Sequence, residues 1–317
     1  GTATLGGTLS LTPINAFVSG AGEQYPLVTY SSRIGSFDTI VASAFDNLVA
    51  GYGATGVVFT TAGACDLDVC WVGTSGDWST GANWSTGNAP VAGQRVRISV
   101  AGNQTVTYSA GTLSVAEIQT DEDFVLSGGA LALAGASAFQ GTLSLTGGTL
   151  TANGITTIGQ LVLGTGTLNG SGNVAITTAF SQGAGTITTS GSLGITQIAG
   201  NLTLGSIAAN SVVAQAQAGA LIVAGPLTSA GDITLAARGP ANNLTVSNTI
   251  TASGAPGRTL TLQSDNSVIF NTGADVVTTN ALQVVLNADH DASAVGAITL
   301  GVGTVIAMAL WGVWNGR

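Results

Sequence analysis

The side chains with the greatest chemical capacity lie in two short clusters. Asp289, His290 and Asp291 place the single histidine of the chain between two carboxylates, a combination that can bind a metal or transfer protons. Successive residues on a strand point to opposite faces, so these three side chains converge only in a turn. We expect a solvent-exposed turn here, with Ca²⁺ bound by Asp289 and Asp291 as the alternative.

The densest acidic run is Asp121, Glu122 and Asp123. Acid catalysis on polysaccharides requires carboxylates that meet on one face of the fold, often with a basic partner. Residues 124–231 contain no Asp, Glu, Lys or Arg, so the middle of the chain cannot build such a face. We therefore predict a solvated loop at 121–123, with Ca²⁺ binding as the alternative, and we predict no catalytic residue, no enzyme activity and no cofactor.

The two cysteines, Cys65 and Cys70, lie in the sequence ACDLDVC. Four intervening residues form a short loop that a disulfide can close, and a disulfide indicates an oxidising compartment. Free thiols, or half of an intermolecular metal site, are the alternatives. Two sulfur atoms alone do not make a zinc site, so no metal is assigned to them.

The composition is unusual for a folded chain of 317 residues. Hydrophobic residues make up 45% and charged residues only 7%, and there are 47 glycines. The hydrophobic content supports a large core, whereas an ordinary domain is roughly 25% charged. There is no Lys, six Arg and a net charge of −9. An acidic chain without a basic surface lacks the electrostatic attraction that nucleic acids require, which excludes DNA and RNA as partners.

Short apolar-x-apolar segments separated by small polar clusters recur from about residue 100 to residue 300. They include LALAG, LSLTG, LVLG, VAIT, LTLG, LIVAG, ITLAA, LTVS and LTLQS. This alternation is typical of short strands with one buried face. Leu143 and Leu161 are 18 positions apart, and Leu202 and Leu221 are 19 apart. This spacing favours an all-β fold, a right-handed parallel β-helix (β-solenoid), over a low-complexity linker.

In a β-solenoid each strand pairs in parallel with its equivalent one coil away, about 4.8 Å along the axis. Roughly ten coils would then form a rod about 50 Å long. Inward positions take Leu, Ile, Val and Ala, whereas outward positions need only be small and polar, and Thr suits a pleated strand.

The first seventy residues differ from the rest because they are richer in aromatic side chains. These are Tyr25, Tyr30, Tyr52, Phe17, Phe37, Phe45 and Phe59. We expect residues 1–70 to be the end of a preceding β-helical unit with a Cys loop, and residues 71–317 to be a β-helix unit opened by a Trp-rich cap. The uncharged run 295–314 is interpreted as buried strand, with a membrane helix as the alternative.

Three tryptophans open the second unit in CWVGTSGDWSTGANWSTG, at Trp71, Trp78 and Trp84. A terminal repeat must cap the stack, and large aromatic side chains can cover a core that would otherwise contact water. Exposed Trp rings can instead stack on sugars. We expect these tryptophans to be a cap, with glycan contact as the alternative.

Three segments resemble large bacterial exoproteins. GGTLSLTPINAFVSGAGEQYPLVTYSSRIGSFDTI resembles the segment that closes β-helical units in autotransporters and two-partner-secreted exoproteins, and the Trp-rich segment resembles one that opens such a unit. LTLQSDNSVIFNTGADVVTTNALQVVLNADHDASAVGAITLG is similar to repeats of the filamentous haemagglutinin type. Together these segments cover most of the chain.

The resemblance implies a non-catalytic rod segment of a secreted bacterial surface adhesin or extracellular matrix protein. Its expected partners are other copies or neighbouring units of the same protein and host or matrix glycans, and membrane association would require a separate anchor. A self-assembling extracellular filament and a β-helical polysaccharide-active enzyme are the alternatives.

Overall fold

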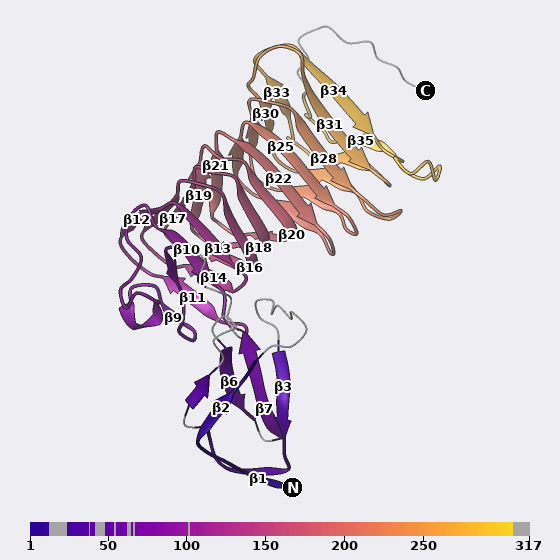
Figure 1. Ribbon diagram of the computed structural model, residues 1–317. Helices are drawn as coiled ribbons and strands as arrows, with labels where there is room; N and C mark the ends of the chain where they lie inside the picture. The colour runs from indigo at the N-terminus through magenta and orange to yellow at the C-terminus, as the bar shows by residue number, and fades with distance from the viewer. Residues whose placement is uncertain are drawn as a thin grey trace.

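The computed structural model describes residues 1–12, 24–37, 39–41, 48–53, 55–61, 65, 67–100 and 102–306. Among these residues the only helical element is the short 3-10 turn η1 (Gly81–Asn83), and almost all regular structure is β-strand. Figure 1 shows the strands stacked into a solenoid that follows a smaller amino-terminal module. The predicted all-β solenoid, with about ten turns, is confirmed.

The largest sheet runs the length of the solenoid, and every strand pair in it is parallel. Its strands in spatial order are β8 (Val69–Cys70), β10 (Arg95–Ile98), β13 (Glu117–Thr120), β16 (Ser137–Leu145), β18 (Thr156–Leu163), β20 (Val174–Gln182), β22 (Ser192–Gln197), β25 (Ser211–Ala216), β28 (Ile233–Ala237), β31 (Arg258–Ser264) and β34 (Leu282–Asn287). The strands β9 (Gly76–Asp77), β11 (Thr105–Tyr108) and β14 (Asp123–Leu126) branch from it.

A second parallel sheet follows the largest one from β12 onward, and a third is present only in the later coils, from β23 onward. One contains β12 (Thr112–Val115), β15 (Ala130–Leu133), β17 (Thr149–Ala152), β19 (Thr167–Gly170), β21 (Thr186–Thr189), β24 (Ile207–Ala209), β27 (Leu227–Ser229), β30 (Ile250–Ala252) and β33 (Val276–Thr278). The other contains β23 (Leu202–Leu204), β26 (Leu221–Val223), β29 (Leu244–Val246), β32 (Val268–Phe270) and β35 (Ile298–Leu300).

The coil length read from the sequence matches the register of the strands. Leu143 pairs with Leu161 and Leu202 pairs with Leu221, as the spacing predicts. The coils lengthen toward the carboxyl end. The chain between the paired residues Val268 and Ile298 is much longer than the chain between the paired residues Leu143 and Leu161. Figure 1 shows the solenoid broadening in that direction.

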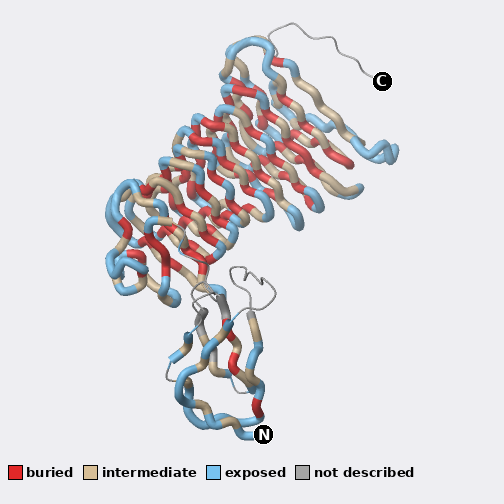
Figure 2. Tube along the Cα trace, in the orientation of Figure 1, coloured by how far each residue is buried: buried red, intermediate tan, exposed pale blue. Residues whose placement is uncertain are grey.

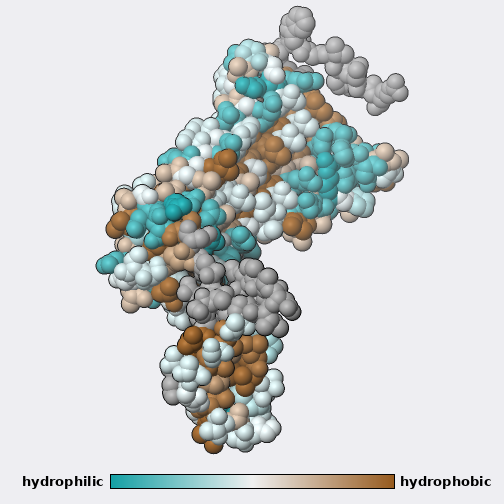
Figure 3. Space-filling model, in the orientation of Figure 1, coloured by the Kyte–Doolittle hydropathy of each residue, from teal (hydrophilic) through white to brown (hydrophobic). Residues whose placement is uncertain are grey.

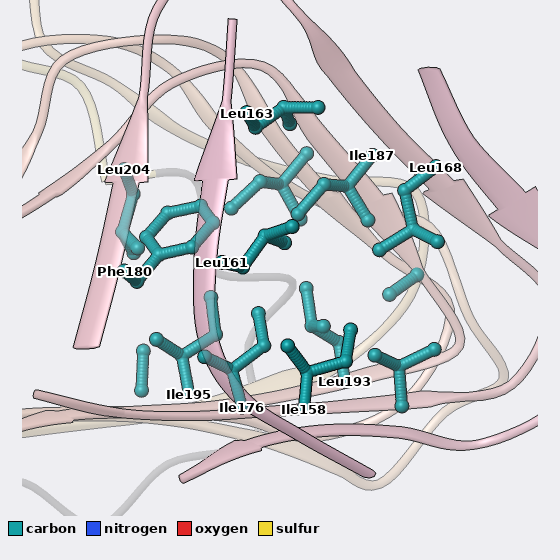
Figure 4. Packing of buried hydrophobic residues seen from close by; sticks show 14 of the residues in the cluster. Ile158, Leu161, Leu163, Leu168, Ile176, Phe180, Ile187, Leu193, Ile195 and Leu204 are labelled. Atoms are coloured by element: carbon teal, nitrogen blue, oxygen red, sulfur yellow. The ribbon is translucent and has the colours of Figure 1, made fainter. Parts of the chain in front are cut away.

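The solenoid has one continuous hydrophobic core, running from Val69 to Leu282. Along most of its strands buried and less buried residues alternate, which Figure 2 shows as red and tan segments. Equivalent residues stack from coil to coil, as Ile158, Ile176 and Ile195 do in Figure 4. Burying one such side chain contributes roughly 1.5–3 kcal/mol, so the stack is held chiefly by its aliphatic rows.

Several hydroxyl side chains also point inward, contrary to the expectation that small polar residues lie outside. They are Ser137, Thr156, Thr189, Ser229 and Ser264, all buried. Thr189 shows the reason, because its Oγ1 donates to the carbonyl oxygens of Gly170 and Gly172 at 3.1 Å and accepts from the Gly191 N–H at 3.1 Å. A buried polar group is tolerated when it is hydrogen-bonded, and here it satisfies the backbone of a corner.

The amino-terminal module has its own small core, which includes Tyr30, Val57 and Phe59. It combines two parallel pairs, β1 (Thr2–Leu5) with β4 (Ser32–Gly35) and β2 (Thr8–Ser10) with β5 (Thr39–Val41). A three-stranded antiparallel sheet follows, in the order β3 (Gln24–Thr29), β7 (Gly56–Thr61) and β6 (Leu48–Tyr52). Phe17 and Phe45 lie outside the described residues.

Part of the apolar run 295–314 can be described. Residues 298–300 form β35, and Ile306 makes a parallel bridge to Val276, so the expected strand is present. The expectation that it is buried is wrong for β35, because all three of its residues are exposed. Among the described residues, no helix has the length and apolar character needed to cross a membrane.

Candidate functional site

The tryptophan segment closes the amino end of the solenoid core. Trp71 forms an antiparallel bridge with Trp84, and their rings meet edge to face at 4.9 Å. Trp78 follows β9, and its ring packs edge to face against three others. The ring centroids are 4.7 Å apart for Trp84, 5.7 Å for Tyr108 and 5.9 Å for Phe124. Such edge-to-face contacts contribute about 0.5–1.5 kcal/mol each beyond burial. The aromatic rings therefore continue the core to the end of the stack.

The three tryptophans lack the open ring face that a sugar would need. All three are buried, at 1% to 4% exposure. The Trp84 Nε1 donates to the Trp78 carbonyl oxygen at 2.7 Å, and the Trp71 Nε1 donates to the Thr74 carbonyl oxygen at 3.1 Å. A sugar ring requires an exposed aromatic face for stacking. The geometry therefore favours the cap over the glycan contact.

Asp77 fixes the loop that carries Trp78. Its carboxylate accepts hydrogen bonds from the hydroxyl groups of Ser79 and Ser109, both at 2.6 Å, and from the Ser79 N–H at 2.9 Å. The hydrogen bonds from Ser109 and Ser79 lower the pKa of Asp77 below its usual value. Because Ser109 lies on the next coil, this carboxylate links the cap to the solenoid.

Replacing Asp77 with Asn is expected to lower stability at neutral pH and to weaken its dependence on acid. A carboxyl group whose pKa is lower in the folded state stabilises the fold above its unfolded pKa, near 4. That contribution is lost as the pH falls through the folded pKa. The effect should be below ~1 kcal/mol, because the group is partly exposed and screened. Urea unfolding of both proteins between neutral and acidic pH measures the difference.

Glu122→Gln should change the pH dependence of stability in the direction opposite to that of Asp77→Asn. Burial raises the pKa of Glu122, although hydrogen bonds from the Gln104 and Val100 backbone oppose the shift. A raised carboxyl pKa contributes stability that is present at acidic pH and is lost as the pH rises through the folded pKa. The two variants should therefore change the slope of stability against pH in opposite directions, and a change in the same direction would contradict one of the two assignments.

Cys65 and Cys70 form a disulfide in the structure, with Cα atoms 5.5 Å apart. Cys70 lies on β8, which pairs with β10 at the start of the solenoid. The Cys70 N–H donates to the Ser85 Oγ at 3.0 Å, and its carbonyl oxygen accepts from the Ser85 N–H at 2.8 Å. The disulfide loop thus ends on the strand that enters the cap.

The acidic run 121–123 accepts hydrogen bonds chiefly from the loop at residues 99–104 on the preceding coil, and also from the following coil. Asp121 accepts from the Ser99 hydroxyl at 3.0 Å, and Asp123 accepts from the Asn103 amide at 3.3 Å and from the Thr142 N–H at 2.8 Å. Glu122 accepts from the backbone N–H groups of Val100 at 3.2 Å and Gln104 at 2.6 Å. The carboxylates of this run act as acceptors for the protein's own donors.

The expectation of a solvated loop at 121–123 is wrong for Glu122, which is buried. The physical reason is that its two oxygens satisfy backbone donors that the facing loop leaves unpaired. Asp123 lies on β14 rather than in a loop. Among the described residues, no group of three or more His, Cys, Asp or Glu side chains has an arrangement that could hold a metal ion.

The cluster around His290 joins three successive coils. Asp289, His290 and Asp291 lie in a turn, as expected, and Asp289 accepts hydrogen bonds from Ser293 and from the Ala294 N–H. The His290 Nδ1 lies 3.4 Å from a carboxylate oxygen of Asp265, which also contacts Arg238 at 3.3 Å. Sequence reasoning missed this Arg238–Asp265–His290 cluster, because its members are far apart along the chain in a region where the coil length changes.

The middle of the solenoid presents an uncharged surface. In Figure 3 most of it is white or pale, and strongly hydrophilic side chains gather in patches. A shallow groove crosses β20, β22 and β25 on the largest sheet, and Ile155, Gly194 and Val213 contribute to its lining. The groove contains no ionisable side chain among its lining residues, so it offers shape and apolar contact rather than acid–base chemistry.

The fold and the cap together define this chain as a capped β-solenoid. No family model, no curated protein and no solved structure matches it. The function therefore has to be inferred from the arrangement of its own residues.

Proposed function

We propose that the protein is a non-catalytic rod segment of a secreted bacterial surface adhesin or extracellular matrix protein. The observation that carries the proposal is the unbroken core from Val69 to Leu282, surrounded by coils that contain no charged residue between 124 and 231. In such a stack each additional coil lengthens the rod by about 4.8 Å. The disulfide supports an oxidising, extracellular setting.

Negative-stain electron microscopy at low protein concentration tests the proposal. We expect single straight rods whose solenoid part is about 50 Å long, because about ten turns are stacked along one axis. A solenoid depends on contacts between neighbouring coils, so the rods should keep their shape at high ionic strength.

Two results would contradict the rod. Compact particles without an elongated part would show that the coils do not stack in solution. Release of reducing ends or unsaturated products from acidic or neutral polysaccharides would instead support the enzyme alternative. A fold of this type hosts both rods and enzymes, so the polysaccharide assay belongs beside the microscopy.

A self-assembling filament is the second candidate. It is favoured by one specific observation: the carboxyl-terminal coil exposes side chains that belong to the inward rows of the stack.

A further inference from the structure

The sheet that runs from β12 to β33 carries two parallel rows of outward side chains, which we call the hydroxyl array. Figure 1 shows the strands of this sheet following one another along one side of the solenoid. The first row consists of Thr112, Ala130, Thr149, Thr167 and Thr186, and the second of Ser114, Ala132, Thr151, Asn169, Thr188, Ala208, Thr228, Thr251 and Val277. Between the two rows, the intervening residue of each strand from β15 to β33 is buried in the core.

The hydroxyl array is regular in two directions. The nine strands of its sheet pair in parallel without a shift of register, whereas the pairings of β16 with β18 and of β18 with β20 on the largest sheet each contain a shift. Neighbours within a row are about 4.8 Å apart, and the two rows are roughly 6.6 Å apart because they lie two residues apart on each strand. The outward side chains therefore lie on a two-dimensional lattice.

The protein itself does not use the hydroxyl groups of the array. Among the described residues, the side chains of Thr149, Thr151 and Thr167 make no hydrogen bond. A threonine at a neighbouring corner behaves differently, since the Thr165 Oγ1 donates to the Thr146 carbonyl oxygen at 2.7 Å. Each hydroxyl group has one donor and two acceptor positions. Those of the array are thus available to a ligand.

One amide oxygen in the middle of the array also has no partner. Asn169 lies opposite Thr151 on one side and Thr188 on the other. Its Oδ1 is buried and makes no hydrogen bond within the described part of the chain. A buried acceptor without a donor is costly. Asn169 as a residue is only half-buried, so a small rotation of the amide brings this oxygen to a donor on the outward side.

The chemistry of the array suits an ordered, uncharged water lattice. Its two rows contain no ionisable and no aromatic side chain. A charged group would hold a hydration shell of its own, and stacking on a sugar ring requires an aromatic face. Threonine instead places a methyl group, which restricts the orientation of adjoining water, beside a hydroxyl group that hydrogen-bonds to it.

A ligand that fits the whole array must repeat in two dimensions at similar spacings. On the prism face of hexagonal ice, the oxygen atoms repeat along two perpendicular directions at distances close to those within and between the two rows. We propose that the hydroxyl array binds ice. Water ordered over the methyl groups and hydrogen-bonded to the hydroxyl groups joins the ice lattice. This activity goes beyond the proposed rod function and does not depend on it.

The threonine-rich strands β17, β19 and β21 form the centre of the binding face. Each of them places a threonine in the first row, and the second row adds Thr151, Asn169 and Thr188. The face continues on both sides of this centre, because the nine strands of the sheet extend over about 38 Å, which is eight steps of about 4.8 Å. The rod shape thus serves to hold many equivalent side chains in one plane of contact.

Slow freezing of a dilute solution of the full chain onto a chilled surface tests the proposal. Growing ice excludes proteins that do not bind it. We expect this chain to be enriched in the ice relative to the remaining liquid, as absorbance of the two fractions measures. We also expect it to keep ice crystals small during annealing just below the melting point.

Two lysine variants distinguish the array from the rest of the rod. Thr167→Lys should reduce the enrichment in ice by about tenfold or more, because the ammonium group is costly to dehydrate. The matched control is Thr157→Lys, which places the same charge at an exposed outward position of β18 on the largest sheet and should bind ice like the wild type. If circular dichroism shows that Thr167→Lys loses structure, Thr151→Lys is the second variant of the same face.

The possible outcomes each decide the matter. Enrichment in ice that is lost in the array variants and kept in Thr157→Lys supports the proposal. Exclusion of the wild type from ice would overturn it, and so would an equal loss in Thr157→Lys, which would place the contact elsewhere. Binding of the wild type to crystalline cellulose or chitin, lost in Thr167→Lys without any enrichment in ice, would identify a polysaccharide surface instead. Electron microscopy tests the rod separately, so failure of ice binding leaves the rod proposal intact.

Discussion

Trp84→Ala is expected to destabilise the amino end of the solenoid by about 3–5 kcal/mol. Trp84 is buried, its ring packs edge to face against Trp71 and Trp78, and its Nε1 donates to the Trp78 carbonyl oxygen. The substitution removes all of these contacts and leaves a cavity directly above the aliphatic core. Urea unfolding measures the change in the free energy of unfolding, and hydrogen exchange locates it.

The effect should be local, because a solenoid is stabilised by contacts between neighbouring coils. Hydrogen exchange should accelerate in β8 to β11, whereas β22 to β28 should retain most of their protection. The matched control is Val91→Ala in the same segment, which removes an exposed side chain and should change stability by less than ~0.5 kcal/mol. Unchanged stability of Trp84→Ala, together with lost binding to a glycan, would show that the cap assignment is wrong.

The periodic part of the fold could be predicted from the sequence, because each coil repeats the same short signal. In the middle coils an apolar-x-apolar strand and a small-residue corner recur at a nearly constant interval, and the register observed at Leu143 and Leu161 is the one that this spacing indicates. The tryptophan cap was predictable for a related reason, since three large side chains occur together where the repeats begin. Equivalent residues of successive coils stack on one another, so the periodicity of the sequence is nearly sufficient to predict which residues pair.

Features that depend on contacts between coils of unequal length could not be predicted. Asp265 meets Arg238 and His290 only because the coils in this region are longer than those in the middle of the solenoid. The burial of Glu122 depends on backbone donors in a facing loop whose shape carries no sequence signal. The inward hydroxyl of Thr189 looks like any outward threonine in an alternating strand, and only the corner carbonyls that it satisfies explain its position.

The glycines carry a second periodic signal, which marks a corner of the coil. Gly135, Gly154, Gly172 and Gly191 recur at the interval of the middle coils, and the structure places them in one column. A Cβ added at Gly154, Gly172 or Gly191 would overlap the carbonyl oxygen of the preceding glycine in the column. Glycine is required there because the backbones of successive coils approach too closely for any side chain.

Gly191→Ala is therefore expected to destabilise the solenoid by about 1–3 kcal/mol, since the added methyl group forces two coils apart. Gly194→Ala, three positions away on the same coil, is the matched control. A Cβ at Gly194 would have its nearest neighbour, the Val174 carbonyl oxygen, at 3.9 Å, an ordinary contact.

Replacing glycine with alanine should thus lower the free energy of unfolding at position 191 and raise it at position 194. Gly194→Ala removes backbone freedom from the unfolded chain without a native clash, which should stabilise the protein by about 0.4–1 kcal/mol. Urea unfolding of both variants decides the matter, because a general penalty for alanine in these strands would destabilise both. Equal losses at Gly191 and Gly194 would contradict the close approach of the coils at the glycine column. A loss confined to Gly191 would show that coil spacing, rather than strand propensity, fixes glycine at the corner.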